Sequence, residues 1–439
     1  MAWELKKNHA KLFKSFNNLL TNRNFFKDYL FANKHFTRDR SLSFQTVVLL
    51  ILRLLKSSLK TELKSFYTQV FNEDKVVNWV SDAALCKARQ KIKYELFEVL
   101  SKMMANSFYD INKGNLWKGY RLLGVDGSEI NLPSSDELIR DFGKHHSNSI
   151  GTEIPQARVS FLTDVLNKIT LDASIKSFRI SEQAMLDEHI NYITSNDLLT
   201  ADANYGHFWI LKKVTATGAN YCFRVNKCSA FIKDFLASGE KDVILNWEPS
   251  RNSIVNCRKN SIDESPMPVR VVRIDLEHET EVLVTSLTDQ QEYSYQEISD
   301  LYNTRWGTEE VFKKFMQRLM IEFFSSIKTN GVLQDFYANI FMLNAVSLLS
   351  YQSNKQVFEN SKTLKYRRCI NWTSALRDVR QSFVLLFLRA VEHVEDILLF
   401  LFDSFKYNTE AIKPGRKFKR DKRKKGARKK AFICYKPAW

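Results

Sequence analysis

The stretch "YRLLGVDGSEINLP" (Tyr120–Pro133) decides how the centre of the chain is expected to fold. Its short apolar run ends in Asp-Gly-Ser, and turn residues and a proline follow. Such a run, bounded by turn residues, is typical of a buried β-strand. The sequence therefore predicts a strand with Asp126 at its C-terminal end. A carboxylate in that position needs a physical reason, because charged groups are seldom buried without a partner.

A second aspartate follows a similar run. "DLLTADANYG" (Asp197–Gly206) predicts another short strand, with Asp202 at its end. If this strand and the first one are neighbours in one sheet, the carboxylates of Asp126 and Asp202 lie side by side.

The residues between the two aspartates complete an α/β pattern. "ARVSFLTDVLNKITLDASI" (157–175) predicts two strands joined in a hairpin near Asn167 and Lys168, and "SEQAMLDEHINYI" (181–193) predicts a helix with Ser181 as its N-cap. The order strand, strand, strand, helix, strand indicates a mixed α/β layout.

The flanking segments differ in texture. Residues 1 to about 115 have apolar residues at helical spacing with Lys and Arg between them, which fits either a helix-turn-helix or a helical bundle with a basic face. Residues 206–293 hold four strand-like runs, and Ser294 with Glu297 forms a capping box that opens a helical region. The predicted domains are 1–115, a helical DNA-binding domain; 116–205 and 294–350, the two parts of the catalytic core; 206–293, a β-rich insertion; 351–410, a C-terminal helical region that could support dimerisation; and 411–439, a basic tail.

The charge of the chain points to a polyanionic partner. The net charge is +17, and twelve Lys and Arg against one Asp between Lys413 and Lys430 supply most of it. Such a block binds DNA with salt-sensitive, sequence-blind affinity, and its alternative role is that of a solubilising tail. The N-terminus lacks the apolar core of a signal peptide, the longest apolar runs are too short or too charged to span a bilayer, and the six cysteines form no CxxC pair. A cytoplasmic protein with no membrane partner is expected.

A third acidic segment is "YNTRWGTEE" (Tyr302–Glu310). On a helix, Tyr302, Arg305 and Glu309 share one face with Lys313 and Met316, provided that Gly307 does not break the helix. A glutamate beside an arginine is usually only a surface ion pair. Together with the two aspartates, however, a glutamate could complete a set of hard oxygen donors for Mg²⁺ or Mn²⁺.

Four stretches, taken in order, resemble the DDE transposases of bacterial insertion sequences, in the insertion-sequence-four group. They are "GVDGSEINLP", "IPQARVSFLTDVLNKITLDASI", "LLTADANYGHF" and "YNTRWGTEEVFKKFMQRLMIEFF", the last of which is similar to the family's Y-x2-R-x3-E-x6-K signature. The similarity covers roughly residues 40 to 350. It implies an α/β, RNase H-like mixed-sheet core interrupted by the β-rich insertion, between N-terminal and C-terminal helical regions.

The resemblance assigns roles residue by residue. It implies that Asp126, Asp202 and Glu309 are catalytic and hold two Mg²⁺ or Mn²⁺ ions. It also implies DNA contacts by several residues of the signature segment, among which Trp306 could stack on a displaced base: Tyr302, Arg305, Trp306, Lys313 and Lys314.

Two positions depart from the family pattern. The lysine of the signature falls on Met316, and we hypothesise that Lys313 replaces it. Ala203 stands where relatives often carry arginine. These changes leave the acidic triad intact and bear on the handling of DNA ends.

The implied function is metal-dependent cut-and-paste transposition. Water nicks the transposon end, the freed 3′-OH forms a hairpin with the opposite strand, and the final 3′-OH joins target DNA. The partners would be terminal inverted repeats, target DNA and a second copy of the chain. The alternatives are an inactive, transposase-derived DNA-binding protein and an RNase H-like nuclease without strand transfer.

Overall fold

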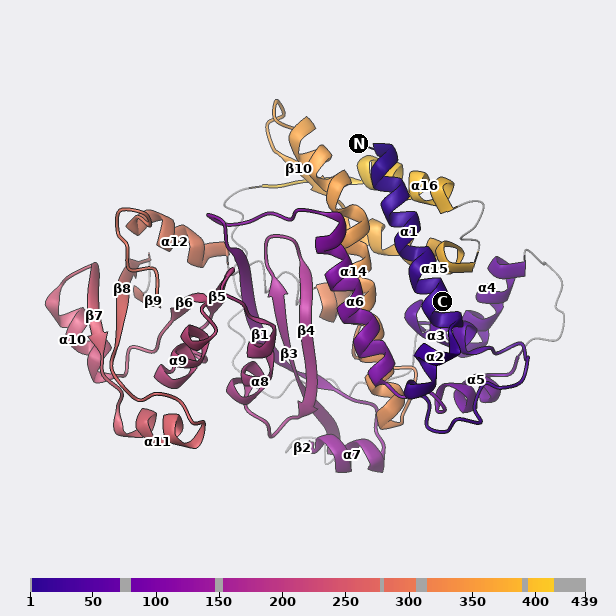
Figure 1. The fold of residues 1–439 in the computed structure, drawn as a ribbon, viewed down its shortest axis with the longest axis horizontal. Coiled ribbons are helices and arrows are strands. Elements are labelled where there is room, and N and C mark those ends of the chain that lie inside the picture. Colours follow the sequence, from indigo (N-terminus) through magenta and orange to yellow (C-terminus); the bar gives the residue numbers. More distant parts are fainter. Residues whose placement is uncertain are drawn as a thin grey trace. The chain divides into compact units, whose positions relative to one another are not determined.

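The computed structural model describes residues 2–71, 80–146, 153–276, 280–304, 314–388 and 394–413. It divides into two compact units. The helical unit comprises Met1–Lys113, Ile130–Ala157 and Phe315–Trp439, and the α/β unit comprises Gly114–Glu129 and Arg158–Lys314. Each is described by itself (Figure 1).

The helical unit is built around one long helix, α14. The elements are α1 (Ala2–Thr21), α2 (Arg23–Phe26), η1 (Lys27–Tyr29), α3 (Phe44–Leu52), α4 (Leu59–Phe71), α5 (Asp82–Arg89), α6 (Glu95–Ile111), α7 (Asp136–Phe142), β2 (Lys144–His146), the π-helical turn η3 (Lys314–Arg318), α14 (Thr329–Asn360), β10 (Arg368–Ile370), α15 (Trp372–Leu388), α16 (Val394–Tyr407) and β11 (Thr409–Ala411).

The core of this unit surrounds α14. Helices α3, α6, α15 and α16 all pack against it. Phe16 of α1 meets Phe341 of α14 edge to face, with ring centroids 5.9 Å apart. By length and composition α14 could cross a membrane, but 94% of its apolar window is buried inside the protein, as in a soluble core helix.

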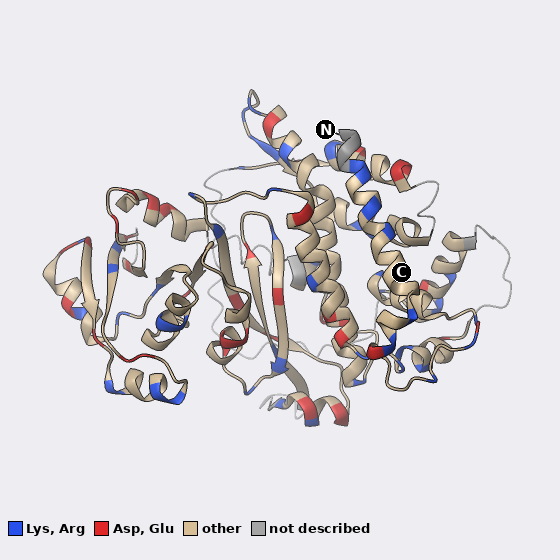
Figure 2. Cartoon of the chain, in the orientation of Figure 1, with Lys and Arg blue, Asp and Glu red and all other residues tan. Residues whose placement is uncertain are grey.

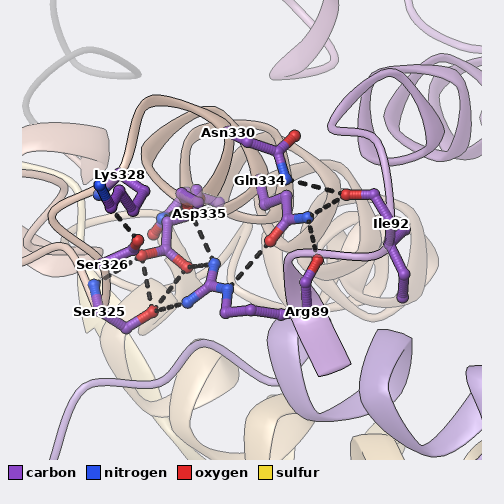
Figure 3. Close-up of polar contacts among 10 residues, drawn as sticks. Arg89, Ile92, Ser325, Ser326, Lys328, Asn330, Gln334 and Asp335 are labelled. Atoms are coloured by element: carbon purple, nitrogen blue, oxygen red, sulfur yellow. Dashed lines mark hydrogen bonds and ion pairs between the residues drawn. The ribbon is translucent and has the colours of Figure 1, made fainter. Parts of the chain in front are cut away.

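A buried arginine ties α5 to α14 (Figure 3). Arg89 is 2% exposed. Its guanidinium donates to Gln334 Oε1 at 2.9 Å, Ser325 Oγ at 2.6 Å, Gly331 O at 2.9 Å and Asp335 Oδ1 at 3.0 Å. By sequence Arg89 is one of several basic residues in this region. In the structure it is buried and paired, so it is not part of an exposed basic surface.

Several other basic residues of the helical unit are exposed. On α1, the exposed Lys7, Lys11 and Lys14 follow helical spacing, and the basic positions of this helix are lysines (Figure 2). Residues 72–79, which join α4 to α5, and the basic tail from residue 414 lie outside the described residues. The helix-turn-helix therefore stays a prediction.

The α/β unit contains most of one mixed sheet. It holds the following elements, except that Ile130 and Asn131 of β1 and residues 153–157 of β3 belong to the helical unit: β1 (Arg121–Asn131), β3 (Glu153–Asp164), β4 (Ile169–Ser177), α8 (Glu182–His189), η2 (Ile190–Tyr192), β5 (Asp197–Ala201), α9 (Phe208–Ala216), β6 (Asn220–Arg224), α10 (Ala230–Ser238), β7 (Asp242–Trp247), α11 (Arg251–Lys259), β8 (Met267–Asp275), β9 (Thr280–Thr285) and α12 (Tyr295–Thr304). The strand order is β2-β3-β1-β5-β6-β9-β8-β7, with β4 on β3. The mixed α/β fold class predicted from the sequence is confirmed.

Local signals give several elements as predicted. The hairpin β3–β4 turns through Lys168, whose φ of 58° is left-handed. Ser181 caps α8, accepting a hydrogen bond from Ala184 N at 3.2 Å. Ser294 and Glu297 form the capping box, because each side chain accepts from the other's backbone N–H.

The segment 206–293 contains all four predicted strands, β6 to β9. It also contains helices α9, α10 and α11, which the sequence reading does not place. Its strands continue the sheet of β1 and β5, because β6 pairs in parallel with β5 and β9 pairs with β6. The domain boundaries at residues 205 and 293 stay a prediction.

Candidate active site

The parallel register of the central strands aligns the two predicted aspartates. Strand β1 pairs with β5 up to Gly124 opposite Thr200. Asp126 follows two residues after Gly124 and Asp202 two residues after Thr200, so both come just beyond the same end of this pairing, and both are half-buried. Side chains at equal register on neighbouring strands point to the same side of a sheet. The structure thus brings together the two carboxylates that the sequence places on separate strands.

One detail of the prediction is wrong, because Asp126 does not end its strand. Strand β1 continues to Asn131, since β3 is its other neighbour in the sheet. What stops near Asp126 is only the pairing with β5, after Gly124. The sequence signal of Asp-Gly-Ser marks this end of one ladder rather than the end of the strand.

Tyr205 is a buried residue on which several acidic side chains act. It is 1% exposed. Burial raises the pKa of its phenol well above 10, and the nearby charges of Glu182, Asp126 and Asp202 raise it further. A negative phenolate is disfavoured where negative charge is already concentrated. The two aspartates and Glu182 therefore act on the same buried group.

The loop after β5 is fixed to α8 through Asn204. Its backbone N–H donates to Asp202 Oδ1 at 2.8 Å, and its Nδ2 donates to Glu182 Oε2 at 2.6 Å. Its carbonyl oxygen accepts from Gln183 Nε2 at 2.7 Å. Asn204 therefore connects the carboxylate of Asp202 with that of Glu182.

Two glycines allow the close approach of these segments. A Cβ on Gly206 would lie 2.6 Å from the carbonyl oxygen of Arg224, so the loop after Asp202 could not pack there with a larger residue. A Cβ on Gly127 would lie 3.1 Å from Glu182 Cγ. Glu182 therefore lies against the backbone that directly follows Asp126.

A buried polar chain holds α8 on the hairpin. His189 Nδ1 is 2.7 Å from Asp172 Oδ2, and His189 Nε2 is 3.0 Å from Ser160 Oγ. The residue types match those of a serine hydrolase triad. All three are buried, with Ser160 and His189 at 0% exposure, so no substrate reaches the hydroxyl. These hydrogen bonds between Asp172, His189 and Ser160 are structural. They hold α8, which has Glu182 at its start.

A cation lies level with the aspartates on the next strand. Ala201 pairs with Phe223, so the continued register sets Asp202 opposite Arg224. Arg224 Nη1 donates to Glu281 Oε1 at 2.8 Å. Burial opposes the charge on Arg224, but Tyr302, Glu281 and Asp202 outweigh it and raise its pKa. Arg224 therefore stays charged beside Asp202.

The residues of the signature segment are only partly described. Tyr302, in α12, is 3% exposed and belongs to an apolar cluster with Leu198, Cys222 and Ile298. Met316 lies in the π-helical turn η3. Arg305, Trp306, Glu309 and Lys313 lie outside the described residues, as does the side chain of Lys314. The catalytic role of Glu309 and the DNA contacts stay predictions.

Two of the three predicted metal ligands, Asp126 and Asp202, are among the described residues. Among the described residues, no group of three or more His, Cys, Asp or Glu side chains is arranged to hold a metal ion. Asp126 and Asp202 supply hard oxygen donors just beyond the same end of the β1–β5 pairing, which suits Mg²⁺ or Mn²⁺. The described pair fits such an ion and needs a further ligand.

Sequence reasoning misses three residues of this site: Glu182, Asn204 and Arg224. Glu182 follows the N-cap Ser181, and acidic residues are common in a first helical turn, so nothing distinguishes it. Arg224 ends a strand-like run, and only the register of β5 with β6 reveals that it is level with Asp202. Only Asn204 has a signal in the sequence, since it stands two residues after the predicted metal ligand Asp202.

Comparison with known proteins identifies the family of this chain. Residues 117–345, more than half of the chain, match the family described as "Transposase DDE domain". The chain belongs to this family of DDE-domain transposases.

One curated relative is "Transposase InsG for insertion sequence element IS4" of Escherichia coli (strain K12). It is 21% identical over 281 residues, which cover 63% of this chain and 62% of the relative. The chain thus aligns with less than two thirds of the relative's length. A cryo-EM structure of piggyBac transposase in a synaptic complex with hairpin DNA is similar with a TM-score of 0.44 and 11% identity, over 94% of this chain and 84% of that one.

Proposed function

We propose that the protein is a DNA transposase that cuts the ends of an insertion sequence and joins them to target DNA. Membership of the DDE-domain family supports this function. The observation that carries the proposal is that Asp126 and Asp202 follow the same end of the β1–β5 pairing, and that both add to the effect of burial on the pKa of Tyr205. Glu309 would supply the third carboxylate.

The carboxylates would hold the divalent ions. Asp126, Asp202 and Glu309 would bind Mg²⁺ or Mn²⁺, most simply two ions, since hard cations prefer carboxylate oxygens. When bound, such ions activate an attacking oxygen and stabilise a leaving one in phosphoryl displacement. Asn204 would orient the Asp202 carboxylate through its 2.8 Å hydrogen bond.

The basic and aromatic residues would handle the DNA strand. Arg305 could pair with phosphate oxygens through two parallel hydrogen bonds, and Lys313 and Lys314 would add positive charge. Trp306 would stack on a base. The predicted DNA contact of Tyr302 does not fit its 3% exposure in an apolar cluster, so Tyr302 would instead anchor the start of this segment. Basic tail residues beyond the described part would add sequence-blind affinity.

The reaction would proceed in the order that the family resemblance implies. Hydrolysis at the transposon end frees a 3′-OH, this hydroxyl attacks the opposite strand to form a hairpin, and the reopened 3′-OH attacks target DNA. Two copies of the chain would act on paired ends, in the cytoplasm. An inactive DNA-binding descendant is the competing function, because Met316 and Ala203 replace basic residues of the family pattern.

Cleavage of a labelled duplex that carries the inverted repeats flanking the gene tests this proposal. The wild type should cut at the repeat boundary only with Mg²⁺ or Mn²⁺, and the Asp126→Asn variant should not cut. Glu188→Gln is the matched control, because Glu188 is an exposed acid on α8 that pairs with Lys176 at the surface. Tight binding of the repeats without any cutting by the wild type would favour the inactive descendant.

A further inference from the structure

A polar cavity lies within the helical unit, apart from the acidic residues of the α/β unit. It has a volume of about 370 Å³. The end of α3, one side of α4 from Thr61 to Gln69 and the middle of α15 form its walls. The lining residues are Arg53, Ser57, Thr61, Glu62, Ser65, Gln69, Arg380 and Gln381.

One charge pair in this cavity is well matched. Arg380 donates to the carbonyl oxygens of Arg53 and Leu54, both at 3.1 Å, and so satisfies the C-terminal end of α3. It also donates to Glu62 Oε1 at 2.7 Å. Glu62 is 2% exposed and accepts further hydrogen bonds from Ser57 N and Ser57 Oγ. Arg380 and Glu62 therefore balance each other.

Arg53 is not matched in this way. It is 6% exposed, and its Nη2 donates to Ser65 Oγ at 2.8 Å. Its Nε and Nη1 are buried and have no hydrogen-bond partner among the described residues. Burial lowers the pKa of Arg53, Glu62 opposes this effect, and Arg380 adds to it. Two guanidinium groups thus share the cavity with one carboxylate.

The unmatched positive charge is specific to this cavity, because another buried arginine of the same unit is fully paired. In the same unit, the buried Arg89 has four acceptors, one of them the carboxylate of Asp335. A buried donor without an acceptor is costly, and a buried charge without a partner is more so. An anion in the cavity would supply what Arg53 lacks.

We propose that this cavity binds the oxyanion of a phosphate group. Its oxygens would accept hydrogen bonds from the Arg53 guanidinium and from the hydroxyls of Thr61 and Ser65, in a space large enough for one such group. The source is the DNA backbone, a choice that rests on the proposed function; free inorganic phosphate has the same chemistry.

Thermal unfolding with inorganic phosphate tests the cavity itself. In the wild type, phosphate should raise the unfolding midpoint, as any ligand of the folded state does. In Arg53→Met this rise should disappear, and without phosphate the variant should be at least as stable as the wild type, since an unmatched buried charge is gone. Arg377→Gln removes a charge from the same α15 at a side chain that is 60% exposed, and it should keep the rise.

Equal rises in all three proteins would reflect only the general stabilising effect of phosphate, and the proposal would be overturned. If Arg53→Met does not fold, Ser65→Ala takes its place. It keeps the charge and removes one hydroxyl from the cavity, so a reduced rise is expected. An undiminished rise in Ser65→Ala would equally overturn the proposal.

The salt dependence of duplex DNA binding identifies the source of the phosphate. If it is a backbone phosphate, Arg53→Met should lower the slope of log affinity against log salt by about 0.9, the value for one phosphate contact. An unchanged slope with a lost phosphate effect assigns the cavity to free phosphate. Neither measurement involves cleavage, so failure of the proposed nuclease activity leaves both results readable.

Discussion

The Arg89 network of the helical unit and the acidic residues of the α/β unit use charge in opposite ways. Arg89 is buried, and its guanidinium is engaged by Gln334, Ser325, Gly331 and Asp335. Asp126, Asp202 and Glu182 are half-buried and have like charge, and they add to the effect of burial in raising the pKa of Tyr205. Matched charge joins helices that are far apart in the sequence. Gathered like charge has a cost in folding that a bound cation would offset.

Breaking the matched network should have the largest effect on stability. Asp335→Ala leaves the Arg89 guanidinium buried with its carboxylate removed, which should cost about 3–5 kcal/mol of unfolding free energy. Urea unfolding followed by circular dichroism measures it. Glu359→Ala, on the same helix with an exposed partner in Lys362, should leave stability nearly unchanged. Equal effects of the two variants would mean that the Arg89 network does not hold α5 to α14.

A change in the acidic loop should act through its backbone. In Gly206→Ala the new Cβ meets the Arg224 carbonyl oxygen at 2.6 Å, and backbone cannot move aside as a flexible side chain can. We expect a loss of about 1–3 kcal/mol, the usual cost of overpacking. The cleavage rate of the folded variant should also fall, because the loop directly follows Asp202. Unaltered cleavage in a destabilised variant would separate this loop from the active site.

Removing the link between Asp202 and Glu182 should affect cleavage with less effect on stability than Gly206→Ala. Asn204→Ala keeps its backbone N–H but loses the 2.6 Å hydrogen bond to Glu182. Cleavage should fall roughly 10- to 100-fold, as for other residues that orient metal ligands, with little change in stability. The exposed Asn191→Ala is the control and should cleave normally. Normal cleavage by Asn204→Ala would show that Glu182 has no part in positioning Asp202.

The smallest expected effect is confined to high pH. Because the folded pKa of Tyr205 lies above 10, the folded state keeps a proton that the unfolded chain releases. This contribution is complete below pH 10 and is lost as pH rises through the raised pKa. Tyr205→Phe should therefore lose less stability above pH 10 than the wild type does. Parallel curves of unfolding free energy against pH would contradict the gathering of acidic groups around this phenol.

The two regions also differ in what the sequence could reveal. Local signals placed Ser181, the Ser294–Glu297 box and the turn at Lys168, because each depends on a few neighbouring residues. Strand β5 is predictable for the same reason, although it ends at Ala201, directly before Asp202.

Contacts between distant segments could not be predicted. Arg89 looked like one of several basic residues, and its partner Asp335 is 246 residues away. Glu182 and Arg224 join the site only through helix packing and strand register, which no local pattern encodes. The extension of β1 beyond Asp126 depends on pairing with β3.

The most direct test of the central claim is Mn²⁺ binding, followed by electron paramagnetic resonance, for the wild type and Asp202→Asn. If Asp126 and Asp202 share one cation site, the wild type binds Mn²⁺, Mg²⁺ competes, and the variant loses most of the affinity while it remains folded. Binding of Mn²⁺ by Asp202→Asn as tightly as by the wild type would contradict the shared site.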